Sequence, residues 1–202
     1  MMFKKNVFPG VVHYSILLDA FAKHSSPKNA LTLYKKMLKV GLTPSTFTYT
    51  ILINMFVERN MIHEAFNLFK KMTENGLIPD KVTYTSIIAG FCRVGDMKRA
   101  WLLHKEMFRR GQPPNIVTYT CLVDGFCKLR RMDMADLVIS EMRQNNIMPD
   151  VVTYTALVAG YRRLGDFDRA YKVFQKMKES GILPDYTAYV TLGLGSTRDQ
   201  DG

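Results

Sequence analysis

Five side chains that can hydrogen-bond each follow a proline and recur every 35 residues. They are Ser45, Asp80, Asn115, Asp150 and Asp185. An ionised carboxylate only accepts hydrogen bonds, an amide both donates and accepts, and a hydroxyl does either. All five residues also belong to the types preferred at the N-cap of a helix. Two kinds of chemistry are therefore open to this position, the capping of a following helix and hydrogen bonding to a ligand.

A second recurring set consists of cations. Lys23, Arg93, Lys128 and Arg163 share one position of the same period, and Glu58 interrupts the row. The whole chain has 28 Lys and Arg against 18 Asp and Glu, a formal net charge of +10. Such an excess favours a polyanionic partner, either nucleic acid or an anionic membrane surface. No run approaches the roughly eighteen apolar residues of a membrane span, so no membrane partner is expected.

The residue types that build metal and catalytic sites show no suitable spacing. They are Cys92, Cys121 and Cys127, with His13, His24, His63 and His104. The cysteines form no Cys-x-x-Cys pair and have no histidine at zinc-ligand spacing. His104 takes a position held elsewhere by Phe or Tyr, which indicates a packing role. We therefore predict no metal, no cofactor and no catalytic residues.

A repeat of 35 residues positions all of these side chains. Alanine and methionine recur with the same period as the prolines, at Ala30, Ala65, Ala100, Ala135 and Ala170, and at Met37, Met72, Met107, Met142 and Met177. The period divides the chain into complete windows at 11–45, 46–80, 81–115, 116–150 and 151–185. Residues 1–10 fit the tail of a preceding window. Residues 186–202 are predicted to be a partial window followed by a disordered tail from Gly193.

Each window predicts a helical hairpin. In window 151–185, the apolar residues of each half are spaced i, i+3, i+4 and i+7, as on one face of a helix. They are Tyr154, Leu157, Val158 and Tyr161, then Ala170, Val173, Phe174 and Met177. Gly165 and Asp166 between them suit the end of one helix and the N-cap of the next. One hairpin cannot cover its own apolar stripe, so the sequence predicts an all-α solenoid of stacked antiparallel hairpins, with the alanines and methionines in its core.

The motif Val-Val-Thr-Tyr-Thr-Ala-Leu-Val-Ala-Gly-Tyr at 151–161, closing with Gly-Ile-Leu-Pro-Asp at 181–185, resembles the pentatricopeptide repeat. Close copies begin at Val82 and Val117. The resemblance spans residues 11–185 fully and both ends partially. The Trp-Leu-Gly-Tyr pattern of the tetratricopeptide repeat is absent. The resemblance implies a right-handed superhelix that binds single-stranded RNA, one base per repeat.

The resemblance also assigns roles to side chains. The fifth and last residues of each repeat read the base edge, which makes the reading pairs Ser15 with Ser45, Thr50 with Asp80, Thr85 with Asn115, Thr120 with Asp150, and Thr155 with Asp185. The second residue packs between successive bases, at Val12, Phe47, Val82, Val117 and Val152. The row of cations is expected to contact phosphates. For the last residue of each repeat, helix capping alone remains the competing interpretation.

Donor and acceptor patterns predict the bases. The Watson-Crick edge of guanine offers two adjacent donors, so Thr with Asp favours guanine. Adenine offers one donor and one acceptor, which the amide of Asn115 can match with both of its functions. The resemblance places the amino end of the array toward the RNA 5′ end. The predicted target is then 5′-(purine)-G-A-G-G-3′, in which the base of the first repeat is left open.

Two further interpretations concern partners and location. A solenoid also presents a concave surface for peptides, so a protein-interaction scaffold is the alternative, and an uncapped end can pair with a second copy. The small polar residues at both reading positions favour RNA, because a peptide groove does not require them. The resemblance implies organellar RNA metabolism in the mitochondrion or chloroplast, although the opening MMFKKNVFPG is no targeting peptide.

Overall fold

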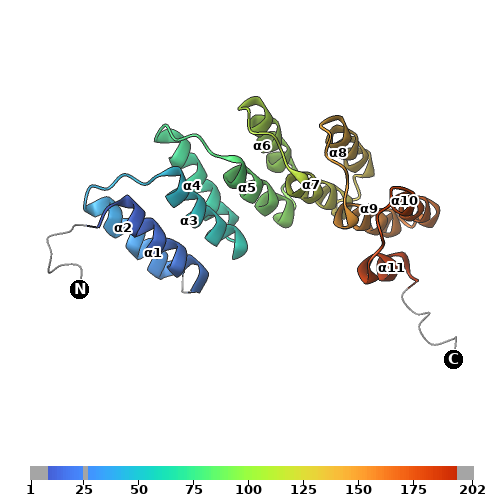
Figure 1. Ribbon diagram of the computed structural model, residues 1–202, viewed down its shortest axis with the longest axis horizontal. Coiled ribbons are helices and arrows are strands. Elements are labelled where there is room, and N and C mark those ends of the chain that lie inside the picture. The colour runs from blue at the N-terminus through green and yellow to red at the C-terminus, as the bar shows by residue number, and fades with distance from the viewer. Residues whose placement is uncertain (1–8, 25–26, 195–202) are drawn as a thin grey trace. The chain divides into compact units, whose positions relative to one another are not determined.

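The computed structural model describes residues 9–24 and 27–194, and all regular structure in these ranges is α-helical (Figure 1). In chain order the helices are α1 (Val11–His24), α2 (Pro27–Lys39), α3 (Thr46–Glu58), α4 (Ile62–Glu74), α5 (Lys81–Val94), α6 (Met97–Arg109), α7 (Ile116–Lys128), α8 (Met132–Gln144), α9 (Val151–Leu164), α10 (Phe167–Glu179) and α11 (Tyr186–Leu192). Most of the predicted preceding-repeat tail, residues 1–8, and residues 195–202 of the predicted disordered tail lie outside the described residues.

Consecutive helices pack as hairpins. Contacts join α1 to α2, α3 to α4, α7 to α8, and α9 to α10. The first helices of neighbouring windows also pack together, α1 on α3, α7 on α9, and α9 on α11. The first helix of every window begins at the first residue of that window, from Val11 to Tyr186. The predicted all-α array of stacked hairpins is therefore confirmed.

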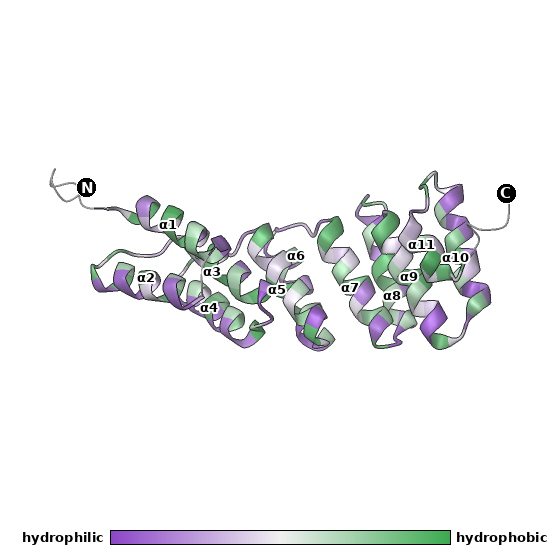
Figure 2. Cartoon of the chain, turned by 90° about the horizontal axis from the view of Figure 1, so that it is seen from below, coloured by the Kyte–Doolittle hydropathy of each residue, from purple (hydrophilic) through white to green (hydrophobic). Residues whose placement is uncertain are grey.

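The chain forms two compact units, Met1–Gly90 and Phe91–Gly202, each with its own apolar core. In the first unit Tyr49 and Leu52 are fully buried, and in the second Tyr119 and Leu122 are. The repeated alanines and methionines, from Ala30 to Met177, expose no surface at all. Their predicted packing role is confirmed. Hydrophilic and hydrophobic residues both occur along the helices (Figure 2).

In the four windows from residue 46 to residue 185, the turn inside the hairpin contains a residue with positive φ: Asn60, Gly95, Arg130 or Gly165. Gly165 is this residue in the last complete window, with φ of 79°, and the side chain of Asp166 then accepts a hydrogen bond from the Arg169 N–H at 3.0 Å. Both roles agree with the sequence prediction. The equivalent residue in window 116–150 is Arg130, which adopts φ of 59° despite its side chain. Left-handed backbone is unfavourable for such a residue, so this turn carries strain that the Gly165 turn does not.

Candidate functional site

The last residue of each window caps the helix that follows it. In four windows the side-chain Oδ1 accepts a backbone N–H three residues ahead: Asp80 from Thr83 at 2.8 Å, Asn115 from Thr118 at 2.9 Å, Asp150 from Thr153 at 2.9 Å, and Asp185 from Ala188 at 2.8 Å. Ser45 does the same with Oγ, which accepts the Thr48 N–H at 3.3 Å. Capping of this kind contributes about 1 kcal/mol per helix. The capping role open to these residues is thus observed.

A buried threonine stands at the third position of four windows. Thr48, Thr83, Thr118 and Thr153 expose no surface. Three of their hydroxyls donate to the same Oδ1 atoms that accept the backbone N–H groups. The distances are 2.8 Å from Thr83 to Asp80, 3.0 Å from Thr118 to Asn115, and 2.7 Å from Thr153 to Asp150. Each of these oxygens therefore has two donors from one threonine.

The same hydroxyls also meet the fifth residue of the window before. Thr83 Oγ1 lies 2.7 Å from Thr50 Oγ1, and Thr153 Oγ1 lies 2.6 Å from Thr120 Oγ1. In the first window the contact is Thr48 Oγ1 with Ser15 Oγ at 2.9 Å. Each predicted reading pair in these windows is thus joined through one hydroxyl. We call Thr50–Thr83–Asp80 and Thr120–Thr153–Asp150 the hydroxyl bridges.

The sequence alone does not predict a role for these third-position threonines. Their hydrogen-bond partners lie 33 residues upstream and three residues upstream, so no local pattern shows both contacts. A signal was nevertheless present. A hydroxyl recurs between an apolar second residue and a tyrosine, as in Val82-Thr83-Tyr84, at a place that the period assigns to the buried face.

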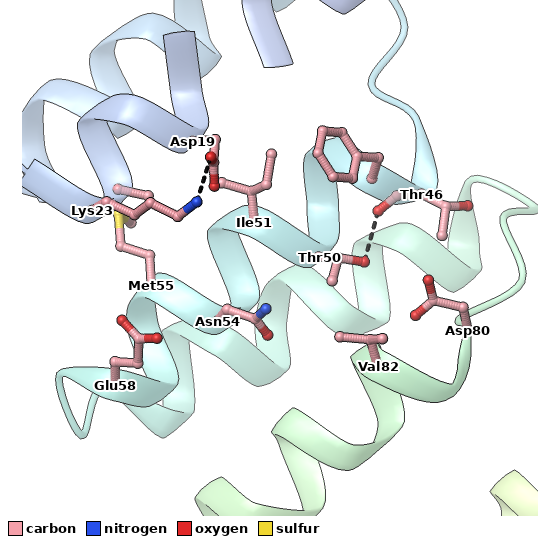
Figure 3. A pocket seen from close by; sticks show the side chains of 12 residues that line it. Asp19, Lys23, Thr46, Thr50, Ile51, Asn54, Met55, Glu58, Asp80 and Val82 are labelled. Carbon is pink, nitrogen blue, oxygen red and sulfur yellow. Dashed lines mark hydrogen bonds and ion pairs between the residues drawn. The ribbon is translucent and has the colours of Figure 1, made fainter. Parts of the chain in front are cut away.

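Within the unit Met1–Gly90, a hollow of about 540 Å³ collects several of the predicted residues (Figure 3). Thr50 and Asp80 lie on its wall, between the second-position side chains of Phe47 and Val82. These two apolar side chains are 60% and 52% exposed. Lys23 lines the same hollow. Apolar surfaces on two sides of a hydrogen-bonding pair suit a flat ring with a polar edge.

The unit Phe91–Gly202 contains a second hollow at the same positions of the repeat, with a volume of about 530 Å³. Thr155 and Asp185 form its polar pair. Val152, which is 58% exposed, stands on one side, and the other second-position residue is Thr187. The arrangement therefore occurs twice, independently, with one wall polar instead of apolar in the second case.

The other predicted residues lie outside the two hollows or at their margins. Val12 and Val117 are exposed, as expected for side chains that pack against a ligand. Thr85 is partly exposed, whereas Ser15 is only 3% exposed. Thr120 reaches the margin of the second hollow. Thr50 is 7% exposed, so Ser15 and Thr50 both offer little surface to a base.

The predicted row of cations is partly neutralised by nearby carboxylates. Lys23 Nζ lies 2.7 Å from Asp19 Oδ2, and Lys128 pairs in the same way with Asp124 one helical turn earlier. Asp19 lines the first hollow and Asp124 the second. Exposed pairs of this kind contribute little, about 0–1 kcal/mol, so a phosphate can replace the carboxylate at small cost. Phosphate contact by Lys23, Arg93, Lys128 and Arg163 stays a prediction.

Cys92 and Cys127 are buried, and Cys121 is half-buried. Desolvation raises the pKa of Cys127 to about 12 and that of Cys92 further, which keeps both as neutral thiols. Cys121 shifts in the same direction for the same reason, burial raising its pKa. Across residues 9–24 and 27–194, no three His, Cys, Asp or Glu side chains gather as a metal site. No helix in that part of the chain is long and apolar enough to cross a membrane.

His104 is a fully buried packing residue, as its position in the repeat predicts. Its ring stacks on Trp101 with centroids 5.3 Å apart, and its Nε2 lies 2.8 Å from Glu141 Oε1. Lys105 holds the other oxygen of Glu141 at 2.7 Å. Burial lowers the pKa of His104 below its usual 6.5, and the hydrogen bond that the Glu141 carboxylate accepts only partly opposes this shift.

Comparison with known families gives one match that covers most of the chain. Residues 9–58, 52–93, 79–128, 114–163 and 149–192 match the PPR repeat family. A comparison with curated proteins finds no match.

Solved structures give further similarities. The crystal structure of the pentatricopeptide repeat protein PPR10 from maize is 28% identical, with a TM-score of 0.74, over 88% of this chain and 26% of PPR10. PPR10 in complex with an 18-nt psaJ RNA element is also 28% identical, with a TM-score of 0.70, over 89% of this chain and 26% of PPR10. The chain therefore spans about a quarter of the length of PPR10.

A third structure supports the fold alone. The PPR domain of Arabidopsis thaliana protein-only RNase P 1, in complex with tRNA, is 20% identical. Its TM-score is 0.79, over 91% of this chain and 96% of that domain.

Proposed function

Because the chain belongs to the PPR repeat family, we propose that it binds single-stranded RNA selectively, with one base at each repeat. The observation that carries this proposal is the hollow repeated in both units, in which a fifth and a last residue lie between two second-position side chains. The complex of PPR10 with an RNA element supports the same function for a similar array. We propose binding without catalysis, because the sequence contains no convergent catalytic set.

In the first hollow, a base would stack between Phe47 and Val82 and turn its edge toward Thr50 and Asp80. Stacking of a base on an aromatic side chain contributes about 1–3 kcal/mol and tolerates any base, so affinity and selectivity come from different residues. The polar pair supplies the selectivity. The proposed target is 5′-(purine)-G-A-G-G-3′, with the base of the first repeat the least determined.

We also propose that this binding serves RNA processing, stability, splicing or translation in an organelle, the mitochondrion or the chloroplast. The support for this part of the proposal is the family resemblance.

The function is tested by titrating labelled single-stranded RNA that contains GAGG against RNA of equal length that contains CUCC, in identical flanks and at two salt concentrations. Selective binding to GAGG at both concentrations is expected, with affinity falling at higher salt because cations contact phosphates. Equal affinities with a steep salt dependence would reduce the function to charge-driven binding. If neither RNA binds, the protein-interaction scaffold becomes the better explanation.

A further inference from the structure

We infer that the third-position threonines Thr83, Thr118 and Thr153 are positioning residues for base selection, because their hydroxyls fix which atom of the last residue in the preceding repeat faces the base. The inference rests on the proposed function and adds a residue to the two reading positions. It concerns residues that are fully buried and so cannot touch RNA themselves.

The hydrogen bonds to the last residue all fall on one atom. Asp80 Oδ1 receives the Thr83 N–H and the Thr83 hydroxyl, both at 2.8 Å. Asn115 Oδ1 receives the same two groups of Thr118 at 2.9 and 3.0 Å. An amide that faces two donors must present its oxygen to them, so the Asn115 side chain cannot turn its amino group inward. The outward atom is thereby fixed as Oδ2 in Asp80 and Nδ2 in Asn115.

The polar atom of the last residue that lies outside the cap determines which base the repeat prefers. Within residues 9–24 and 27–194, neither Asp80 Oδ2 nor Asn115 Nδ2 makes a hydrogen bond. Asp80 therefore offers an acceptor, which suits a donor on the guanine edge, and Asn115 offers a donor, which suits the ring acceptor of adenine. On this inference Asn115 binds adenine through its amino group alone, whereas the sequence predicts that it uses both of its functions. Its oxygen is already used by the cap.

The hydroxyl bridge also determines whether the hydroxyl of the fifth residue donates or accepts a hydrogen bond. Thr50 Oγ1 lies 2.7 Å from Thr83 Oγ1 and 2.9 Å from the Thr46 carbonyl oxygen. With either partner, the single hydroxyl proton of Thr50 is engaged inside the protein, so its oxygen meets the hollow as an acceptor. Thr50 and Asp80 then present two acceptors to the two donors of guanine. Thr120 is held by Thr153 in the same way, at 2.6 Å.

Two repeats lack this arrangement and serve as internal comparisons. Ser45 has one polar side-chain atom, and the cap uses it, since Oγ lies 3.3 Å from the Thr48 N–H and 3.1 Å from its hydroxyl. No second atom is left for a base. In the fifth repeat, Ala188 replaces the threonine, so Asp185 Oδ1 keeps only the backbone N–H at 2.8 Å. We expect the first repeat to select poorly and the fifth less sharply than the second and fourth.

The test compares Thr83→Val with Thr83→Ser. Valine keeps the shape and the backbone cap but removes the hydroxyl, whereas serine keeps the hydroxyl. The measurement is the ratio of affinities for RNAs that carry guanine or adenine at the base of the second repeat only. Thr83→Val should lower this ratio about three- to tenfold, as expected for the loss of one hydrogen bond, and Thr83→Ser should keep it. The guanine preference at the fourth repeat should not change in either variant.

A ratio measured on one protein sample is insensitive to partial unfolding, and the pair Thr153→Val and Thr153→Ser repeats the experiment in the other unit. Ala188→Thr adds the missing hydroxyl and should raise the guanine preference at the fifth repeat. An equal loss of affinity for both RNAs in the valine variants would show a purely structural role and overturn the inference. An unchanged ratio would overturn it too. If the unmodified chain shows no preference at all, the proposed function itself has failed.

Discussion

In the four repeats that end in Asp or Asn, the last residue has two polar side-chain atoms, and the cap uses one of them. Asp80 and Asn115 cap the next helix with Oδ1, which leaves Oδ2 of Asp80 and Nδ2 of Asn115 outside the cap. From the sequence, capping and base reading are rival explanations for the same residues. The geometry makes them compatible, because the cap occupies only one of the two polar atoms.

The reading role of Asn115 is testable by Asn115→Asp. The cap is retained through Oδ1, but the outward donor becomes an acceptor. We expect the preference between RNAs containing GAGG and GGGG to reverse in favour of GGGG, by at least about fivefold, which is the lower end of discrimination by a well-placed polar pair. Titration with both RNAs measures this change. A preference that stays with GAGG would exclude base reading by the third repeat.

Phe47 is expected to contribute to the affinity for RNA but not to the choice of base. The side chain is 60% exposed, so Phe47→Ala should leave the unfolding free energy nearly unchanged. Loss of stacking should weaken RNA binding about fivefold or more while the preference for GAGG over CUCC stays the same. The matched control is Phe108→Ala, since Phe108 is 51% exposed on α6 and lines neither hollow. Equal losses in both variants would argue against stacking at Phe47.

At the scale of elements, the hairpin turns and helix cores were largely predictable and the side-chain network was not. A period of 35 shows each apolar position five times, which is why the helices, the Gly165 turn and the buried alanines agree with prediction. Thr83 belongs to the third repeat and connects two residues of the second, Thr50 and Asp80, so its hydroxyl contacts depend on how the hairpins stack. The pairing of Lys23 with Asp19 could have been predicted from their four-residue spacing.

A substitution at Arg130 should relieve the strain in its turn and raise the free energy of unfolding. Its φ of 59° is the conformation that Gly165 adopts without strain in the next repeat. Arg130→Gly should raise the free energy of unfolding by about 1 kcal/mol, and Gly165→Arg should lower it by a similar amount. Urea unfolding of the two variants measures both changes. A loss of stability in Arg130→Gly would mean that the arginine side chain contributes more than the turn costs.

The free energy of unfolding should depend on pH through His104. Burial lowers the pKa of His104 in the folded chain, so below 6.5 the unfolded chain binds the proton first. The free energy of unfolding therefore falls as pH decreases from 6.5 toward the lowered pKa, by at most about 1.4 kcal/mol per pH unit. His104→Phe, which copies the residue at position 69, should remove this contribution. Urea unfolding above and below pH 6.5 tests it, and an identical pH dependence in both proteins would contradict it.

At the scale of the whole molecule, a net charge of +10 draws the chain to polyanions while a few carboxylates moderate the attraction. Asp19 and Asp124 stand on the hollows and hold two of the predicted phosphate-binding cations. If the chain binds RNA as proposed, we expect this arrangement to limit binding that depends on charge alone. Selectivity would then depend more on the polar pairs than it would on a purely cationic surface.

Removal of one carboxylate should show this effect. Asp124→Asn frees Lys128, and we expect affinity at low salt to rise about two- to fivefold for GAGG and CUCC alike, with a steeper salt dependence. Asp168→Asn makes the same change of charge on α10, away from both hollows, and is the control. Titrations at several salt concentrations measure the slope. A rise confined to GAGG would mean that Asp124 takes part in base selection.

The cap at Ser45 should affect which nucleotides of a target transcript are free to change during evolution. With its one side-chain oxygen spent on the cap, the first repeat offers a stacking place but no second reading atom. Nucleotide changes at that site would then be nearly neutral for binding, while changes at the four neighbouring sites would be selected against. A natural target is expected to vary at that nucleotide among related genomes and to stay fixed at the others.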